Sequence, residues 1–135
     1  MITTGQYADL ASGIRLHYAS SGSRGLPLVL CIHGFPEYWG AWEDVLPHLG
    51  AWCYAVAPDL RGYNLSSQPA GVDAYRAREI VGDLIGLIGA LGYERAHVVA
   101  HDWGGAGRMA TCHRAAATGA KAGDPQLAAP VRLCA

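Results

Sequence analysis

An unbroken apolar run from Leu26 to Ile32 constrains the fold of this chain more than any other feature. Its length suits a strand, and a strand that is apolar at every position is normally covered on both faces. Shorter apolar runs at 52–57 and 96–100 repeat the pattern. Segments of helical character separate these runs, so we predict an α/β protein whose parallel strands are flanked by helices.

The remaining elements follow from local patterns. Residues 7–10 and 14–18 alternate around a Ser-Gly turn and predict two short strands in a β-hairpin. A second helix is predicted over 73–91, with Asp73 as its N-cap and Gly92 at its end. A first helix is predicted from an apolar stripe with spacings of three and four, made of Trp39, Trp42, Val45, Leu46 and Leu49.

Composition narrows the class of protein. With 135 residues the chain has room for one small domain, and 51% hydrophobic residues are enough to bury a core. A net charge of −1 gives no reason to expect a nucleic acid or an anionic membrane as a partner. No secretory leader and no bilayer-length apolar segment is visible, so a cytoplasmic location is expected. The four cysteines form no Cys-x-x-Cys pair, and we expect neither a metal nor a cofactor.

The stretch from Val98 to Gly105 carries the chemistry. It has the layout small–x–nucleophile–x–small directly after a buried strand, with Asp102 at the nucleophile position. Ala100, Gly104 and Gly105 supply the small side chains that such a tight strand-to-helix turn requires. The following helix would direct its first N–H groups toward the nucleophile. The alternative is that Asp102 only caps this helix.

A carboxylate at this position favours particular reactions. It is ionised at neutral pH and needs no base for activation. It can attack an sp³ carbon of an epoxide or alkyl halide and form an ester, which water can then cleave at the carbonyl. A serine would form an ether that hydrolysis could not readily clear. Asp102 therefore indicates ring opening or dehalogenation rather than ordinary ester cleavage.

The turn after the first long strand supplies a second part of the site. It reads His33-Gly34-Phe35-Pro36, and a backbone N–H here can meet the N–H of the residue after the nucleophile. The two donors would be those of Phe35 and Trp103, forming an oxyanion hole. Taken alone, this string is equally consistent with a simple turn.

Together these motifs resemble the epoxide hydrolase branch of the α/β-hydrolases. The resemblance spans about residues 5–107. It implies the N-terminal part of the α/β-hydrolase fold: a β-hairpin start, then parallel strands with flanking helices, an incomplete sheet and no cap domain. Three stretches in matching order and spacing carry it, namely 33–39 (HGFPEYW), 58–66 (PDLRGYNLS) and 101–105 (HDWGG).

The resemblance also implies residue roles. Asp102 would be the nucleophile, and Phe35 and Trp103 would line the oxyanion hole. The other motif residues would brace the turns around the site, and they are His33, Gly34, Pro36, Ala100, His101, Gly104 and Gly105. Haloalkane dehalogenases usually have Asn where Phe35 stands, and fluoroacetate dehalogenases usually have Arg where Trp103 stands. The substrate implied is a small molecule, an epoxide or less favourably an alkyl halide.

The family mechanism also needs a histidine base, its acid partner and a cap domain, all farther downstream. No histidine here matches the position of that base, so we expect the chain as written to be a non-catalytic fragment of an epoxide hydrolase lineage. We divide it into an α/β-hydrolase part, 1–107, and an aberrant tail, 108–135. A frameshift between Gly105 and Met109 would explain the tail, because the shifted frame permits Trp at Met109 and Asn-Ser-Pro-His-Pro after Asp124. The pattern leaves the natural substrate and the oligomeric state open.

Overall fold

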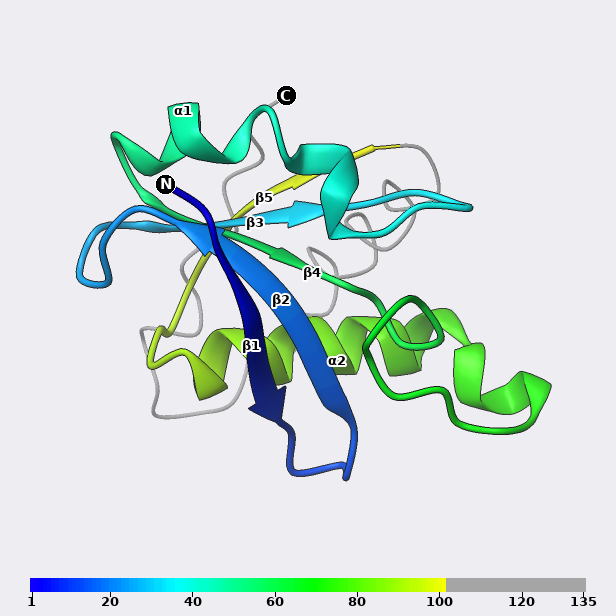
Figure 1. Cartoon of the computed structure of the whole chain (residues 1–135). Coiled ribbons are helices and arrows are strands. Elements are labelled where there is room, and N and C mark those ends of the chain that lie inside the picture. Colours follow the sequence, from blue (N-terminus) through cyan, green and yellow to red (C-terminus); the bar gives the residue numbers. More distant parts are fainter. Residues whose placement is uncertain (102–135) are drawn as a thin grey trace.

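The computed structural model describes residues 1–101, which form one mixed sheet with helices on both faces (Figure 1). The strands are ordered β1-β2-β4-β3-β5 across a five-stranded sheet. Two 3-10 turns, η1 and η2, and two α-helices connect them. In chain order the elements are β1 (Thr3–Asp9), β2 (Arg15–Ser21), β3 (Leu28–Ile32), η1 (Trp39–Trp42), α1 (Leu46–Gly50), β4 (Tyr54–Pro58), η2 (Val72–Tyr75), α2 (Ala77–Ala90) and β5 (His97–Ala100).

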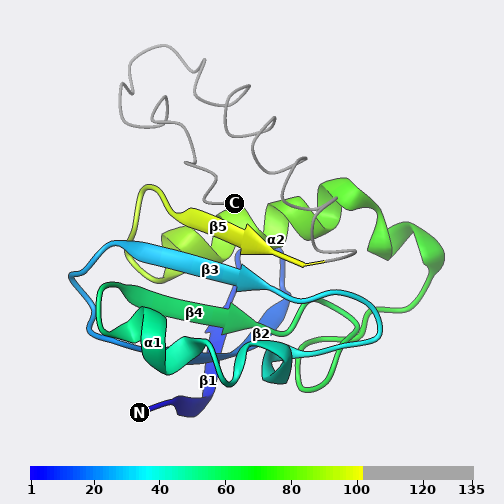
Figure 2. The same cartoon turned by 90° about the horizontal axis from the view of Figure 1, so that it is seen from above.

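One strand, β2, runs opposite to the other four strands of the sheet. The predicted hairpin is confirmed, since β1 and β2 pair antiparallel, and β2 continues antiparallel onto β4. From there the sheet is parallel: Val29 of β3 lies opposite Ala55 of β4 and opposite His97 of β5. Figure 2 shows β4, β3 and β5 running in the same direction side by side. The predicted α/β class, with parallel strands and flanking helices, is confirmed.

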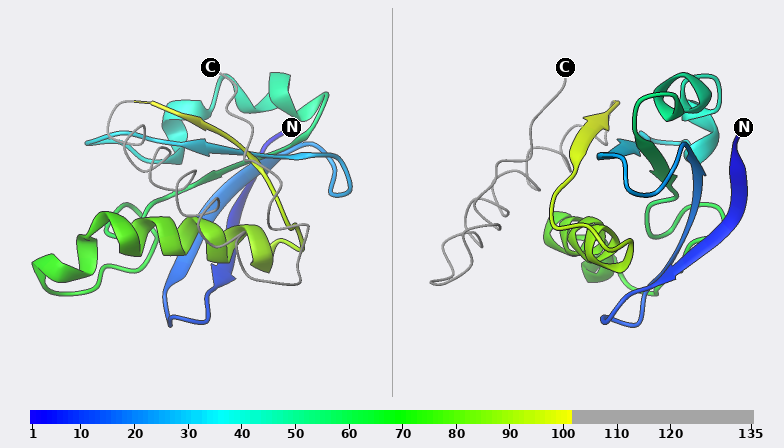
Figure 3. Two further views of the ribbon diagram at one scale, coloured as in Figure 1. Left: turned by 180° about the vertical axis from the view of Figure 1, so that it is seen from behind. Right: turned by 90° about the vertical axis from the view of Figure 1, so that its left-hand side faces the viewer.

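The sheet separates two apolar layers. Helix α1 and turn η1 lie on one face, and α2 crosses the opposite face (Figures 1 and 3). Side chains of a strand alternate between faces, so each central strand serves both layers. In β3, Leu30 faces the α2 layer and Cys31 the α1 layer; in β4, Val56 and Ala55 divide in the same way. This double cover explains why these strands are apolar at every position.

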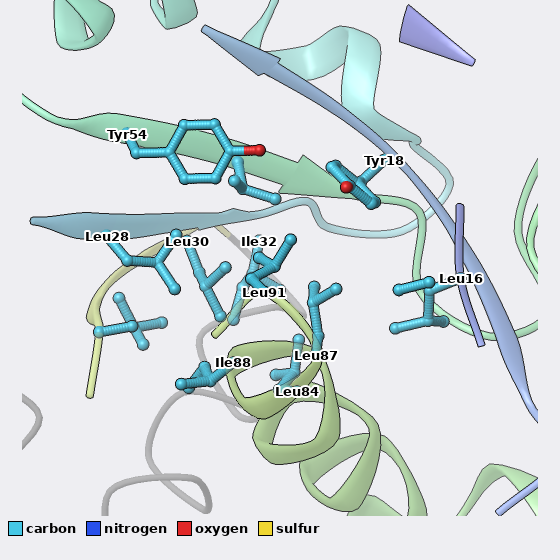
Figure 4. Close-up of a cluster of buried hydrophobic side chains, with 14 of the residues drawn as sticks. Leu16, Tyr18, Leu28, Leu30, Ile32, Tyr54, Leu84, Leu87, Ile88 and Leu91 are labelled. Atoms are coloured by element: carbon cyan, nitrogen blue, oxygen red, sulfur yellow. The ribbon is translucent and has the colours of Figure 1, made fainter. Parts of the chain in front are cut away.

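The larger core lies between the sheet and α2. Leu84 and Leu87 are fully buried and present the apolar stripe of α2 to the strands. Figure 4 shows this stripe pointing at the large side chains of the sheet. The members labelled there are Leu16, Tyr18, Leu28, Leu30, Ile32, Tyr54, Leu84, Leu87, Ile88 and Leu91.

The layer under α1 is thinner because its sheet residues are small. Ala19, Cys31, Ala55 and Ala57 are fully buried there, and Leu46 of α1 packs onto them. Burial raises the pKa of the Cys31 thiol to about 12, so this cysteine stays protonated and acts as a small apolar residue. Small strand residues thus bring α1 and η1 close to the sheet.

Two expectations about helices are wrong. The stripe over 39–49 does not form one helix but η1 and then α1, because Pro47 occupies the first turn of α1, where its missing N–H costs nothing. The N-cap of α2 is Arg76, not Asp73. Arg76 is extended, with φ −64° and ψ 149°, which separates η2 from α2. The Asp73 carboxylate instead accepts a hydrogen bond from the Arg76 guanidinium at 2.7 Å.

The predicted end of the second helix is confirmed. Gly92 follows α2 with φ 84°, the left-handed conformation expected of a helix-ending glycine. Cys31 and Cys53 are buried free thiols. Within residues 1–101, no helix combines the length and apolar character needed to cross a membrane.

We predict that Leu84→Ala lowers the free energy of unfolding by about 2–5 kcal/mol, the usual cost of emptying a buried leucine site. Its neighbour offers a matched control: Ile85 lies on the same helix but is 37% exposed, whereas Leu84 is 0% exposed. Ile85→Ala should therefore cost less than about 1 kcal/mol. Urea unfolding followed by circular dichroism measures both. Equal losses would mean that α2 does not pack as described.

Candidate active site

The candidate site lies where the three parallel strands end. Their carboxyl ends meet at one edge of the sheet (Figure 2), the edge at which open α/β sheets bind ligands. Asp59 follows β4, His33 follows β3, and His101 follows β5. Ala100, the last residue of β5, lies opposite Ile32, the last residue of β3. This pairing brings the 33–37 turn beside residue 101.

The buried His33 ring anchors the 33–37 turn through two hydrogen bonds. It is fully buried, and its Nε2 accepts the Leu60 N–H at 3.0 Å. Nδ1 must therefore carry the proton, and it donates to the Gly34 carbonyl at 2.8 Å. Burial lowers the pKa of His33, so the ring stays neutral near pH 7. Both ring nitrogens are engaged in linking the end of β3 to the end of β4.

The turn is closed a second time by Glu37. The Glu37 N–H donates to the Gly34 carbonyl at 3.2 Å, and the Gly34 N–H donates to Glu37 Oε2 at 2.9 Å. Gly34 is buried, whereas the side chain of Phe35 is 65% exposed and makes an edge contact with the Tyr63 ring. Pro36 is exposed and follows a cis peptide bond. Phe35 thus stands at the outer tip of a turn whose base is fixed.

His101 connects this turn to the end of β5. Its N–H donates to the Ile32 carbonyl at 3.1 Å, which continues the β3–β5 pairing by one residue. Its imidazole Nδ1 lies 3.7 Å from Glu37 Oε2. The predicted nucleophile turn begins at the next residue. Asp102, Trp103, Gly104 and Gly105 lie outside the described residues, as does the predicted tail, 108–135.

A buried carboxylate, Asp59, organises the loop after β4. Asp59 is fully buried, and its Oδ1 accepts the Trp39 N–H at 2.8 Å. Its Oδ2 accepts Asn64 Nδ2 at 2.9 Å and pairs with His17 Nδ1 at 2.8 Å. His17 Nε2 accepts the Gly5 N–H at 3.3 Å, so Nδ1 is the protonated nitrogen. These contacts are those of a structural junction, with no ring nitrogen of His17 left for proton transfer.

Arg61 and Asp83 form a buried ion pair that the sequence pattern did not reveal. Both Arg61 Nε and Nη2 donate to the Asp83 carboxylate at 2.6 Å, a bidentate arrangement. Arg61 Nη1 also donates to the Ala74 carbonyl at 2.7 Å. Hydrogen bonding to Asp83 raises the pKa of Arg61, so the guanidinium stays charged. It fastens the loop after β4 to α2 and to η2.

A cavity of about 310 Å³ opens beside His101, on the α1 side of the sheet. Its walls combine the Glu37 and His101 side chains with Ala41, Trp42 and Val45. Trp42 Nε1 is buried without a hydrogen-bond partner in the described part of the chain. Trp39 and Trp42 both pack against the α1-side core, as expected, but Trp42 also lines this cavity.

The site therefore combines a braced turn with the Glu37 carboxylate at one edge of the sheet. Among residues 1–101, no three His, Cys, Asp or Glu side chains gather closely enough to hold a metal ion. The two buried histidines are fixed by bonds at both ring nitrogens. The remaining chemistry at this edge would come from the turn after β3 and the residues that follow His101.

The strand order and the loops at this edge define an α/β-hydrolase core, in its N-terminal part. A family model described as the alpha/beta hydrolase fold matches residues 27–117. Epoxide hydrolase 1 of Caenorhabditis elegans is 50% identical over 92 residues, covering 68% of this chain and 23% of that protein. Epoxide hydrolase 3 of Siraitia grosvenorii is 48% identical over 94 residues, covering 69% and 29%. The chain thus spans about a quarter of the length of these relatives.

Solved structures agree with the sequence relatives. An epoxide hydrolase from Vigna radiata superimposes with a TM-score of 0.77 at 37% identity, covering 83% of this chain and 36% of that one. An epoxide hydrolase from an endophytic Streptomyces gives 0.78 at 41% identity, covering 83% and 33%. The chain therefore belongs to the α/β-hydrolase family, in its epoxide hydrolase-like branch.

The His33 brace predicts a pH dependence of stability. Because burial lowers the folded pKa of His33, the unfolded chain binds this proton more readily. The contribution is complete above the unfolded pKa of about 6.5 and is lost as the pH falls from there through the folded value. We expect the free energy of unfolding of the wild type to fall between pH 7.5 and pH 5. In His33→Asn the fall should be smaller. Urea titrations across this range measure it, and parallel curves for the two proteins would contradict the prediction.

Proposed function

We propose that this chain carries the nucleophile half of an epoxide hydrolase-type site, in which an epoxide is opened through an ester on Asp102. The supporting observation is the fixed pairing of Ala100 and His101 with Ile32 at the end of β3. Asp102 is bonded to His101, so the nucleophile would start beside the 33–37 turn. The epoxide hydrolase relatives support the same reaction class.

The first step would be attack by the Asp102 carboxylate on an epoxide carbon. A new C–O ester bond forms as the strained ring C–O bond breaks. The ring oxygen stays on the other carbon as an alkoxide and takes a proton from solvent water, which leaves hydroxide in solution. No base is needed for this step, because the carboxylate is the charged nucleophile already. The product is a hydroxyalkyl ester of Asp102.

The second step would be attack by water on the ester carbonyl. The tetrahedral intermediate carries its charge on the carbonyl oxygen, where the N–H groups of Phe35 and Trp103 are proposed to donate. Collapse releases the vicinal diol and regenerates the carboxylate. The loss of one such donor typically raises the barrier by about 2.7–4 kcal/mol. The double closure of the turn at Gly34 supports a preorganised donor at Phe35.

Water attack requires a general base, and the described histidines are poorly suited to the task. His17 and His33 use both ring nitrogens in buried hydrogen bonds. His97 begins β5, at the end of the strand remote from Asp102, and His48 is exposed on α1. His101 immediately precedes the proposed nucleophile, where the resemblance implies a bracing residue and not the base, and its Nδ1 lies 3.7 Å from Glu37 Oε2. We therefore propose that these 135 residues perform ester formation and stall before hydrolysis. The division at residue 107 and the frameshift remain proposals that the coding DNA would test.

Alkyl halides are the second candidate substrate class, because a carboxylate attacks their carbon in the same way. Phe35 favours the epoxide, since the halide-accepting branch usually has Asn at this position. The two substrates leave different adducts. An epoxide adds its whole mass to Asp102, whereas an alkyl halide adds only its alkyl group.

We predict that an aryl epoxide such as styrene oxide adds once to the purified chain, at Asp102. Mass spectrometry of the intact protein and of its peptides should locate one adduct of the full epoxide mass. Asp102→Asn should abolish it, because a neutral amide is a far weaker nucleophile. Glu94→Gln is a control, since Glu94 is an exposed carboxylate in the loop before β5, at the opposite end of that strand from Asp102.

Three outcomes would decide among the alternatives. An adduct that is absent, or equally abundant in Asp102→Asn, would refute the nucleophile. Diol produced over many turnovers would refute the stalled ester. Faster alkylation by a benzyl halide than by the epoxide, with the same dependence on Asp102, would favour dehalogenation.

A further inference from the structure

Glu37 has contacts that neither the proposed nucleophile nor the oxyanion donors explain. One oxygen of its carboxylate, Oε2, accepts the Gly34 N–H at 2.9 Å and lies 3.7 Å from Nδ1 of His101. Gly34 belongs to the turn after β3, and His101 extends β5. A single atom therefore links the two chain segments between which an oxyanion hole would form.

The link to the turn is reciprocal. The Glu37 N–H donates to the Gly34 carbonyl while the Gly34 N–H donates to the Glu37 side chain. Both peptide groups flanking Gly34 are thereby held, and the Gly34 carbonyl also accepts from His33. The Phe35 N–H belongs to the peptide group that carries this carbonyl. Its direction is consequently set by the bonds that Glu37 and His33 make.

The contact between Glu37 and His101 lies on the α1 face of the sheet, opposite the larger core. Val98 and Ala100 pack toward α2, so by strand alternation His101 lies on the α1 face. Its imidazole borders the cavity with Glu37 and Trp42 there. The Nδ1–Oε2 distance of 3.7 Å is too long for a direct hydrogen bond but suits an ion pair when the ring is protonated. The side chain of His101 is 67% exposed and that of Glu37 33%, so water screens this pair, and the firmer contact of Glu37 is the one with Gly34.

We propose that Glu37 is a positioning residue that fixes the spacing between the Phe35 N–H and Asp102. This inference deepens the proposed function and rests on it. Glu37 touches neither substrate nor reacting atoms; it acts through Gly34 on one side and His101 on the other. Proximity effects are steep, and a misplacement of about 1 Å can cost about a hundredfold in rate. The ester carbonyl oxygen that the Phe35 N–H would serve is the Asp102 carboxylate oxygen that does not attack the epoxide. The same N–H would therefore orient the carboxylate before attack, and the effect of Glu37 is measurable in the rate of ester formation.

The contact between Glu37 and the Gly34 amide is tested first without any substrate, by hydrogen exchange of that amide followed by NMR. In Glu37→Ala the Gly34 N–H loses its acceptor, and its exchange should accelerate at least tenfold relative to wild type. Glu37→Gln keeps an acceptor oxygen, so its exchange should stay within about threefold. Glu43→Ala is the matched control, because Glu43 is an exposed glutamate six residues farther along. An unchanged exchange rate in Glu37→Ala would overturn the proposal that Glu37 holds this turn.

The second arm measures the rate of Asp102 alkylation against epoxide concentration. Glu37→Ala should lower the maximal rate about tenfold while leaving the half-saturating epoxide concentration unchanged, and Glu37→Gln should recover most of the rate. Combining Glu37→Ala with His101→Gln should cost less than the product of the two single effects, because the residues share one link. Independent effects, or a lower affinity for the epoxide with an unchanged maximal rate, would overturn the positioning role.

The two arms separate failure of the inference from failure of the proposed function. If the wild type forms no adduct, the proposed function fails, and the exchange of Gly34 still decides whether Glu37 holds the turn. If the wild type forms diol and His101→Gln abolishes diol while keeping the ester, His101 is a base with Glu37 as its partner. That result would overturn the positioning role.

Discussion

Parallel pairing of β3 with β4 on one side and β5 on the other determines where the reactive groups can lie. Parallel strands end at a common edge, so the loops that begin at His33, Asp59 and His101 are neighbours in space although far apart in sequence. The pairing is possible because both faces of these strands are covered, by α2 and by α1. Burial of apolar surface thus sets the geometry of polar loops that take no part in the core.

Buried polar groups then limit how far those loops can move. His33, Asp59 and the Arg61–Asp83 pair are buried near the sheet edge, and each joins the loop after β4 to another part of the fold. Removing one partner would leave the other buried and unsatisfied, which costs more than the bond itself contributes. Such contacts make partial loosening of the edge unfavourable. They suit a site whose N–H donors must be in place before charge develops.

Sequence patterns predicted the strands and the class of fold because apolar runs and turn residues report burial directly. They also located the turn that follows β3 at residue 33. The nucleophile turn that small residues predict over 98–105 extends outside the described residues and stays a prediction. Three-dimensional partners were not predictable in this way. Asp83 interrupts the apolar stripe of α2, which signals a buried partner for its carboxylate, but nothing local identifies Arg61. Likewise Asp73 has the residue type of an N-cap, and only the extended backbone of Arg76 shows that the helix starts later.

Chemistry at a carboxylate nucleophile divides naturally into two halves with different structural needs. In the proposed mechanism, ester formation needs an ionised Asp102 at a fixed distance from two N–H donors. The braced turn after β3 would hold one of these donors, the Phe35 N–H, in place. Ester hydrolysis needs in addition a histidine whose ring can exchange a proton. The two buried histidines are structural. One nitrogen of each ring donates a hydrogen bond and the other accepts one, so neither ring is free to act as a base. Under the proposed mechanism, this part of the fold would suffice for ester formation, whereas ester hydrolysis would depend on a histidine with a free ring nitrogen.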